Sequence, residues 1–138
     1  MSPRDTRTGS VLEQMILPAL ERGGYSYQKQ VNIGQRPGGG RHVVDAIAQK
    51  DGKKWLVSLK WQQVGGTAEQ KVPFEVISLA EAVLSGQYAA AYLVLGGEGW
   101  TLRDFYIGGG LKHHLVHGDK VSIVTLEAFV ARANQGRL

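Results

Sequence analysis

The sequence of 138 residues contains no cysteine, only four prolines and no long uninterrupted apolar run. The missing cysteines exclude disulfides, thiolate nucleophiles, zinc ribbons and iron–sulfur clusters, so any metal ion must bind oxygen or imidazole ligands. The apolar stretch at residues 15–20 is much shorter than the roughly 20 residues of a membrane span, and Pro18 interrupts it. We therefore expect no signal peptide, no membrane partner and a cytoplasmic location.

Composition is typical of a globular protein, with 43% hydrophobic and 20% charged residues. The length suits one domain of ordinary size, and we expect residues 1–138 to form a single domain. Sixteen Lys and Arg side chains against twelve Asp and Glu give a net charge of +4. This basic balance is compatible with a polyanionic partner such as nucleic acid.

Hydrophobic periodicity and turn residues divide the chain into helices and strands. Apolar residues at helical spacing predict helices over residues 8–23, 73–85 and from about 126. Ser10 is the expected N-cap of the first helix, which Pro18 should kink, and Pro73 is expected at the first position of the second. The predicted strands are residues 25–31, 41–49, 55–61, 89–95 and 121–124.

The connections between these elements predict the fold class. Residues 33–41 are rich in glycine and basic, and we expect a mobile loop there between the first two strands. Asp51-Gly52 predicts a tight turn, so the second and third strands form a hairpin. The nearly continuous apolar strand at 89–95 follows a helix, which predicts a parallel crossover and a mixed sheet. The fold is therefore expected to be α/β (α+β), with an α-β-β-β-α-β core.

Polar residues gather on the two strands of that hairpin. Alternation places Ser58, Lys60 and Gln62 on one face of their strand, where Asp45 of the neighbouring strand can meet them. An aspartate inside an apolar strand needs a partner if it is buried. Such a cluster can hold a hard divalent cation on carboxylate and backbone oxygens, with the lysine beside it to orient water for attack on phosphorus.

These residues resemble the signature of the PD-(D/E)XK nuclease superfamily, in which an aspartate at a strand end precedes an acid-x-lysine strand. Asp45 and Lys60 match the aspartate and lysine, whereas Val44 replaces the proline and Ser58 replaces the second acid. The resemblance implies a restriction-endonuclease-like mixed central sheet flanked by helices. The layout looks most like the archaeal-type Holliday junction resolvases, over roughly residues 8–95.

The resemblance also implies where further carboxylates lie. Glu13 takes the place of a glutamate in the first helix of the resolvases, and Glu75 takes the place of the helix glutamate that some restriction endonucleases use when the strand acid is Ser or Thr. Glu69 is the other carboxylate in that region. Asp45, Glu13 and Glu75 would then hold Mg²⁺, with Mn²⁺ as a substitute. Lys60 would position the attacking water, with Ser58 and Gln62 as supporting contacts.

Two of these residues also have structural interpretations. Glu13 follows Ser10 at the spacing of a capping box, in which it would only close the helix N-terminus. Glu75 shares a polar stripe with Ser78, Glu81 and Ser85, which is typical of a solvated helix face.

The predicted partner is DNA. The basic residues around the proposed site can contact phosphates without reading bases, and the expected DNA contacts are Arg4, Arg7, Lys29, Arg36, Arg41 and His42. The resemblance implies a magnesium-dependent crossover-junction endonuclease that acts in DNA recombination and repair, in the nucleoid or in the cytoplasm of an infected host. Because a four-way junction has approximate two-fold symmetry, we expect a homodimer. The alternatives are a restriction-type or repair endonuclease on duplex DNA, or a non-catalytic DNA-binding relative.

Overall fold

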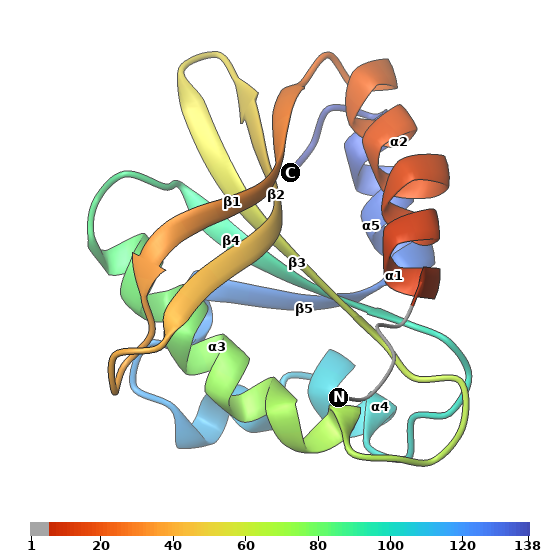
Figure 1. Cartoon of the computed structure of the whole chain (residues 1–138), viewed down its shortest axis with the longest axis vertical. Coiled ribbons are helices and arrows are strands. Elements are labelled where there is room, and N and C mark those ends of the chain that lie inside the picture. Colours follow the sequence, from red (N-terminus) through yellow and green to blue (C-terminus); the bar gives the residue numbers. More distant parts are fainter. Residues whose placement is uncertain (1–5) are drawn as a thin grey trace.

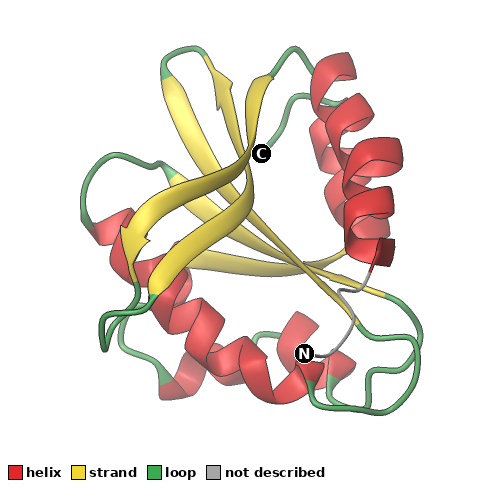
Figure 2. Ribbon diagram, viewed as in Figure 1, coloured by secondary structure: helices red, strands yellow, loops and turns green. Residues whose placement is uncertain are grey.

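One mixed five-stranded sheet organises the protein, and helices cover both of its faces (Figure 1 and Figure 2). The computed structural model describes residues 6–138. The strands are β1 (Ser26–Gln35), β2 (Arg41–Lys50), β3 (Lys53–Trp61), β4 (Ala90–Gly96) and β5 (Val121–Thr125), and they lie in this order across the sheet. β1, β2 and β3 pair antiparallel, whereas β3, β4 and β5 pair parallel. The predicted mixed sheet and fold class are therefore confirmed.

Two layers of helix enclose two hydrophobic cores. On one face lie α1 (Thr6–Val11), the π-helical turn η1 (Leu12–Ile16), α2 (Leu17–Arg22) and α5 (Leu126–Asn134). On the other face lie α3 (Ala68–Leu84), α4 (Arg103–Ile107) and the short 3-10 helices η2 (Gly110–His114) and η3 (Gly118–Lys120). No helix of residues 6–138 is both long and apolar enough to cross a bilayer.

The N-terminal helix differs from the prediction in one respect that concerns the site. The helix already runs from Thr6, so Ser10 lies inside α1 and is not its N-cap. The capping-box interpretation of Glu13 is therefore wrong. The π-helical turn ends at Ile16, two residues before Pro18, and Pro18 stands near the start of α2.

α3 begins at Ala68, five residues before the predicted start, so Pro73 lies inside the helix. Proline has no N–H, and the carbonyl of Glu69 loses the helical hydrogen bond that residue 73 would otherwise give it. The buried hydroxyl of Tyr106 replaces that donor, with its oxygen 2.8 Å from the Glu69 carbonyl oxygen. A donor from α4, distant in the sequence, thus lets the helix extend through a proline.

The glycines after β4 form a turn, as predicted. Gly97 has a φ of +90°, and a Cβ there would lie 2.4 Å from the backbone oxygen of Gln62. The N–H of Gly99 donates to that same oxygen at 2.8 Å. The turn packs directly against the residues that follow β3, so these glycines serve close backbone packing.

We predict that Tyr106→Phe lowers the free energy of unfolding by about 1–3 kcal/mol, because the buried Glu69 carbonyl loses its donor. In a Pro73→Ala background, the new N–H at position 73 can supply that carbonyl, so the same change should cost at least about 1 kcal/mol less. Urea denaturation of the four variants measures this coupling. Equal costs in both backgrounds would contradict the compensation between Tyr106 and Pro73.

Candidate active site

The two hairpin strands β2 and β3 separate at Asp45. Counted outward from the Asp51-Gly52 turn, their backbone pairing ends at Ala46 opposite Val57, one residue short of Asp45. The side-chain alternation of β2 also changes phase there, because Val44 packs in the core beneath α3 whereas Ala46 packs in the core on the opposite face. The irregularity frees the carboxylate of Asp45 from a regular strand position and turns it toward β3.

The Asp45 carboxylate accepts a hydrogen bond from the backbone of β3, although the two strands no longer pair there. Its Oδ2 accepts a hydrogen bond from the N–H of Leu59 at 2.6 Å. Burial raises the pKa of Asp45, the Leu59 hydrogen bond and the positive charge of Lys60 lower it, and the negative charge of Glu75 raises it. Asp45, Lys60 and Glu75 therefore interact electrostatically, although they come from β2, β3 and α3.

Glu75 lies at the centre of this group and is 3% exposed. Its Oε1 is 2.7 Å from Nε2 of His42 on β2. Its Oε2 is 3.0 Å from Nη1 of Arg36, in the loop between β1 and β2, and 3.6 Å from Nζ of Lys60. Three cationic or hydrogen-bonding groups from three segments thus converge on one carboxylate.

The pKa of Glu75 shows how these contacts compensate for the loss of water. Burial alone would raise the pKa, but the hydrogen bond from His42 and the charges of Lys60 and Arg36 lower it to about 2. The carboxylate is therefore ionised at neutral pH. Because an ionised carboxylate can only accept hydrogen bonds, Nε2 of His42 carries the proton in this contact.

A pocket of about 300 Å³ opens beside the carboxylate. Its lining residues are Arg36, Lys60, Gln70, Lys71, Phe74 and Glu75. Three cationic side chains surround one buried carboxylate there, so the pocket combines a floor that suits a cation with a rim that suits a phosphate.

The remaining supporting residues have other partners. Ser58 is buried on β3 and pairs with Leu93 of β4. Gln62 lies one residue beyond β3, where its Oε1 accepts from the N–H of Glu69 at the start of α3 and its Nε2 donates to Gly99. Gln62 therefore caps α3 and clamps the following turn.

The structure separates Glu69 from Glu75, the two glutamates of α3 that were candidates for the site. The carboxylate of Glu69 accepts hydrogen bonds from Thr101, through both its backbone N–H and its hydroxyl, and from the N–H of Leu102. The Thr101 hydroxyl contact lowers the pKa of Glu69, and burial opposes that shift. Glu69 thus fixes the segment before α4, whereas Glu75 is the glutamate that faces Asp45 and Lys60.

Glu13 lies in η1 on the other face of the sheet and is not among these contacts. Its Oε1 is 2.7 Å from Nζ of Lys29 on β1, and both side chains are about half exposed. Within residues 6–138, no group of three or more His, Asp or Glu side chains converges as a metal site. Of the three expected metal ligands, only Asp45 and Glu75 lie in the same electrostatic cluster.

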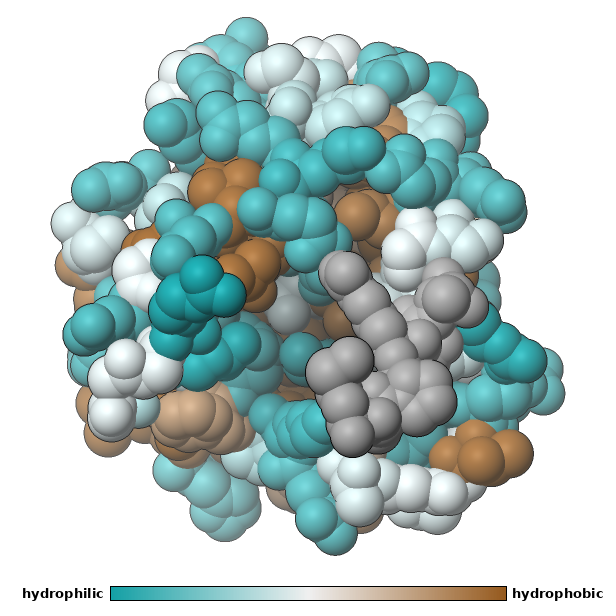
Figure 3. Space-filling view, in the orientation of Figure 1, coloured by the Kyte–Doolittle hydropathy of each residue, from teal (hydrophilic) through white to brown (hydrophobic). Residues whose placement is uncertain are grey.

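The expected DNA contacts divide into several environments. Arg41 is exposed, and Arg7 is an exposed residue beside the loop that follows β3. Arg36 contacts Glu75, and Lys29 pairs with Glu13. Arg4 lies outside the described residues. Hydrophilic side chains predominate on the face seen in Figure 3, and hydrophobic residues are visible in a hollow near its centre.

His42 is a correction to the prediction. Its side chain is only 1% exposed and contacts Glu75, so in this structure it does not lie where a DNA phosphate could reach it. Sequence reasoning placed His42 beside the basic loop but overlooked that the alternating burial of β2 turns it inward. It also overlooked Lys71, which the predicted late start of α3 had left in a loop.

Gln30 is another residue that the sequence did not single out. It lies on β1 between residues that pair with Val44 and Ala46, and its φ of 51° is unusual for a residue other than glycine. A hydrogen bond from its side chain lowers the pKa of Asp45. Asp45 therefore lies where the pairing of β2 is irregular on both sides, with β1 distorted at Gln30 and the pairing with β3 ended at Ala46.

The comparisons with known proteins agree with this geometry. The family model described as a PD-(D/E)XK nuclease superfamily domain matches residues 4–137. The chain therefore belongs to the PD-(D/E)XK nuclease superfamily. Nucleases of this superfamily generally use divalent metal ions.

One solved structure supports the fold. The crystal structure of a protein of unknown function, AF1548, is similar with a TM-score of 0.51 and 10% sequence identity, over 80% of this chain and 54% of that one. The chain thus spans about half the length of that protein. No curated protein matches the sequence.

Asp45 and Glu75 have the donor chemistry that a hard divalent cation requires. Both present carboxylate oxygens, and the negative charge of Glu75 raises the pKa of Asp45. A cation between them would relieve that repulsion. The residues present therefore fit a divalent metal ion held by these two side chains.

We predict that Glu75 makes the protein sensitive to acid. A carboxyl group whose pKa falls from about 4.5 to about 2 on folding stabilises the protein above the higher value, and this stabilisation is lost as pH falls toward the lower one. Between pH 6 and pH 3 this loss should amount to about 2 kcal/mol. Urea denaturation of metal-free protein at both pH values, compared with Glu75→Gln, measures it.

The exposed Glu127, in the first turn of α5, provides the matched control. Glu127→Gln should retain the pH dependence of the wild type, whereas Glu75→Gln should lose part of it. If the free energy of unfolding changed equally between pH 6 and pH 3 in all three proteins, Glu75 would titrate as an ordinary carboxyl group.

Proposed function

We propose that the protein is a metal-dependent, structure-selective DNA endonuclease whose substrate is a four-way junction, as in Holliday junction resolvases. The observation that carries the nuclease chemistry is the convergence of Asp45, Lys60 and Glu75 beside a pocket with a cationic rim. Junction selectivity rests on the sequence resemblance to the archaeal-type resolvases.

Asp45 and Glu75 would hold the metal ion, Mg²⁺ with Mn²⁺ as a substitute. When bound, such an ion withdraws charge from a phosphate oxygen and makes a nearby water more acidic. Glu75 replaces the strand acid that Ser58 lacks, which is why the position of α3 matters to the chemistry. Glu13 would not belong to this pair, because it lies with Lys29 on the other face.

Lys60 and the pocket rim would act on the phosphate. The Lys60 ammonium stands beside both carboxylates, where it can orient water and stabilise negative charge as a phosphodiester bond is hydrolysed. Lys71 and Arg36 supply further positive charge at the mouth of the pocket. Arg7 and Arg41 are exposed and would contact phosphates farther along the DNA.

Two other functions remain as outcomes of the test. A restriction-type or repair endonuclease would use the same cluster on linear duplex. A non-catalytic DNA-binding relative is favoured by one observation, since Ser58 occupies the position of the strand acid. A junction endonuclease would act in DNA recombination and repair, at the nucleoid or in the cytoplasm of an infected host.

We predict that the protein makes paired symmetric nicks in a labelled four-way junction with Mg²⁺, and none with EDTA or on a matched linear duplex. Asp45→Asn, Lys60→Ala and Glu75→Gln should each lower the cleavage rate about 100-fold or more, since each removes charge from the reacting centre. Gel electrophoresis of both labelled substrates provides the measurement.

Glu127→Gln is again the matched control and should cleave like the wild type. Cleavage of junction and duplex at similar rates would replace the resolvase by a general nuclease. Binding without cleavage would make the protein a non-catalytic relative, and wild-type cleavage by Lys60→Ala would contradict the assigned site.

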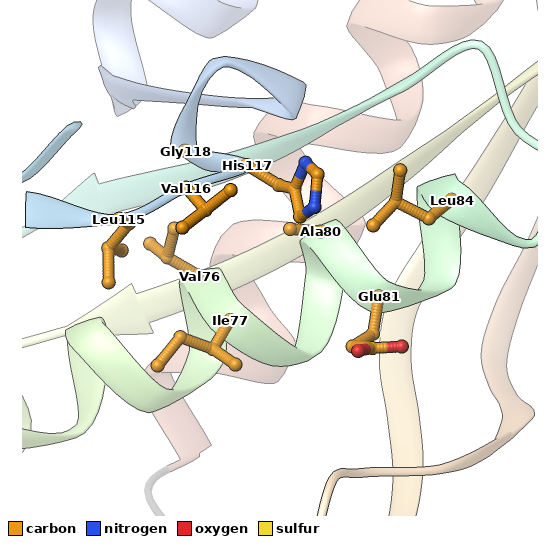
Figure 4. Close-up of a pocket in the computed structure, with 9 residues that line it drawn as sticks. All are labelled: Val76, Ile77, Ala80, Glu81, Leu84, Leu115, Val116, His117 and Gly118. Carbon is orange, nitrogen blue, oxygen red and sulfur yellow. The ribbon is translucent and has the colours of Figure 1, made fainter.

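The proposed homodimer has a candidate surface on α3. A groove of about 150 Å³ lies between α3 and the segment before β5, and Figure 4 shows its mostly apolar lining. Large exposed hydrophobic residues occur along it, with Ile77 38%, Leu84 46% and Val116 91% exposed. Because the same helix carries Glu75, a second copy on this face would bring two sites into one particle.

We predict that Val116→Asp weakens self-association without unfolding the domain, because this side chain is almost fully exposed. Val64, which is 74% exposed on the loop after β3, provides the matched control. Light scattering after size-exclusion chromatography should report a dimer for the wild type and Val64→Asp, and a monomer for Val116→Asp. A monomeric wild type would contradict the dimer.

A further inference from the structure

The two oxygens of the Glu75 carboxylate have unlike partners. Oε1 contacts His42, which is the second residue of β2 and only 1% exposed. Oε2 contacts Arg36 and Lys60, whose side chains are 23% and 26% exposed. One oxygen is therefore held from inside the core, and the other faces the pocket.

Arg36 is the partner best able to leave. It belongs to the five-residue connection between β1 and β2, whose N–H to carbonyl contacts with Gly39 and Gly40 are internal to the turn. In Figure 1 the tip of this hairpin lies beside α3, where Arg36 contacts Glu75. Departure of the guanidinium from Glu75 would break neither a strand pairing nor a core contact.

We propose that Arg36 is an exchangeable counter-ion of Glu75. In the free protein it occupies Oε2, and on substrate binding it moves to a backbone phosphate and leaves this oxygen to a divalent cation. The inference rests on the proposed function, since it assumes that Glu75 holds the metal and that the pocket receives a phosphate.

Charge and geometry support this exchange. Without Arg36, the carboxylates of Glu75 and Asp45 would have only Lys60 and His42 as cationic or hydrogen-bonding side-chain partners from β2 and β3, so the free protein gains from the Arg36 contact. A guanidinium matches the oxygens of a phosphate as well as those of a carboxylate, and a phosphate in the pocket would compete for it. Lys71 lines the same pocket and can hold that phosphate as Arg36 arrives.

Exchange of this kind couples two binding events. Metal must displace Arg36 from Glu75 in the free protein, whereas DNA removes it in advance, so each ligand should strengthen the binding of the other. The protein would then hold its metal ion weakly until DNA is present. An arginine that only contacted DNA would leave the metal affinity of the free protein unchanged.

Isothermal titration calorimetry with Ca²⁺, without DNA and with a four-way junction, tests the exchange without relying on cleavage. We expect the junction to tighten Ca²⁺ binding to the wild type about tenfold. Arg36→Ala should bind Ca²⁺ about tenfold more tightly than the wild type without DNA, and the junction should add less than about half of the wild-type factor. Arg36→Gln keeps a polar side chain and should behave likewise if the alanine variant is unstable.

Arg41→Ala removes the same charge from the same hairpin without a described contact to Glu75, and it should change the DNA-free Ca²⁺ affinity less than about twofold. Unchanged DNA-free affinity in both Arg36 variants, while Glu75→Gln loses Ca²⁺, would overturn the exchange and leave the nuclease site intact. Wild-type Ca²⁺ binding by Glu75→Gln would overturn the metal assignment itself.

Discussion

Glu75 carries an ionised carboxylate into the contact between α3 and the sheet, where little water reaches it. Such a charge costs several kcal/mol unless other groups replace its hydration. His42, Lys60 and Arg36 do so from β2, β3 and the β1–β2 connection. The need to compensate one charge thus fixes a helix, two strands and a hairpin tip relative to one another, and the pocket lies where they meet.

Asp45 depends on a second constraint, which is the local failure of regular sheet pairing. In a regular hairpin its side chain would point along the sheet normal and its backbone would pair with β3. Because pairing stops at Ala46 and β1 is irregular at Gln30, the Asp45 carboxylate can instead accept the N–H of Leu59. The irregularity removes hydrogen bonds between β2 and β3. It also places the Asp45 carboxylate where it interacts electrostatically with Lys60 and Glu75.

The sequence sufficed for the features that depend on local pattern. Strand alternation, the Asp51-Gly52 turn and the apolar strand at β4 predicted the mixed sheet. Features that depend on distant partners could not be predicted. The Tyr106 hydroxyl lets α3 run through Pro73, and Glu75 of α3 is the partner that holds His42 in the interior. Periodicity predicted a solvated stripe on α3, but the β1–β2 hairpin covers Glu75 through Arg36 and His42.

The position of a carboxylate on α3 depends on more of the fold than the position of a carboxylate on β3, the strand that carries Lys60. Ser58 pairs with Leu93 of β4, so an acid there would be placed by the sheet alone. Glu75 is placed by the packing and the start of α3, which depend on Gln62 at the helix N-terminus and on Tyr106 at the Glu69 carbonyl. Residues that touch neither DNA nor metal can therefore shift the distance between the two carboxylates. Because Ser58 replaces the strand acid, the position of the second carboxylate depends on the turns that hold α3 as well as on the sheet.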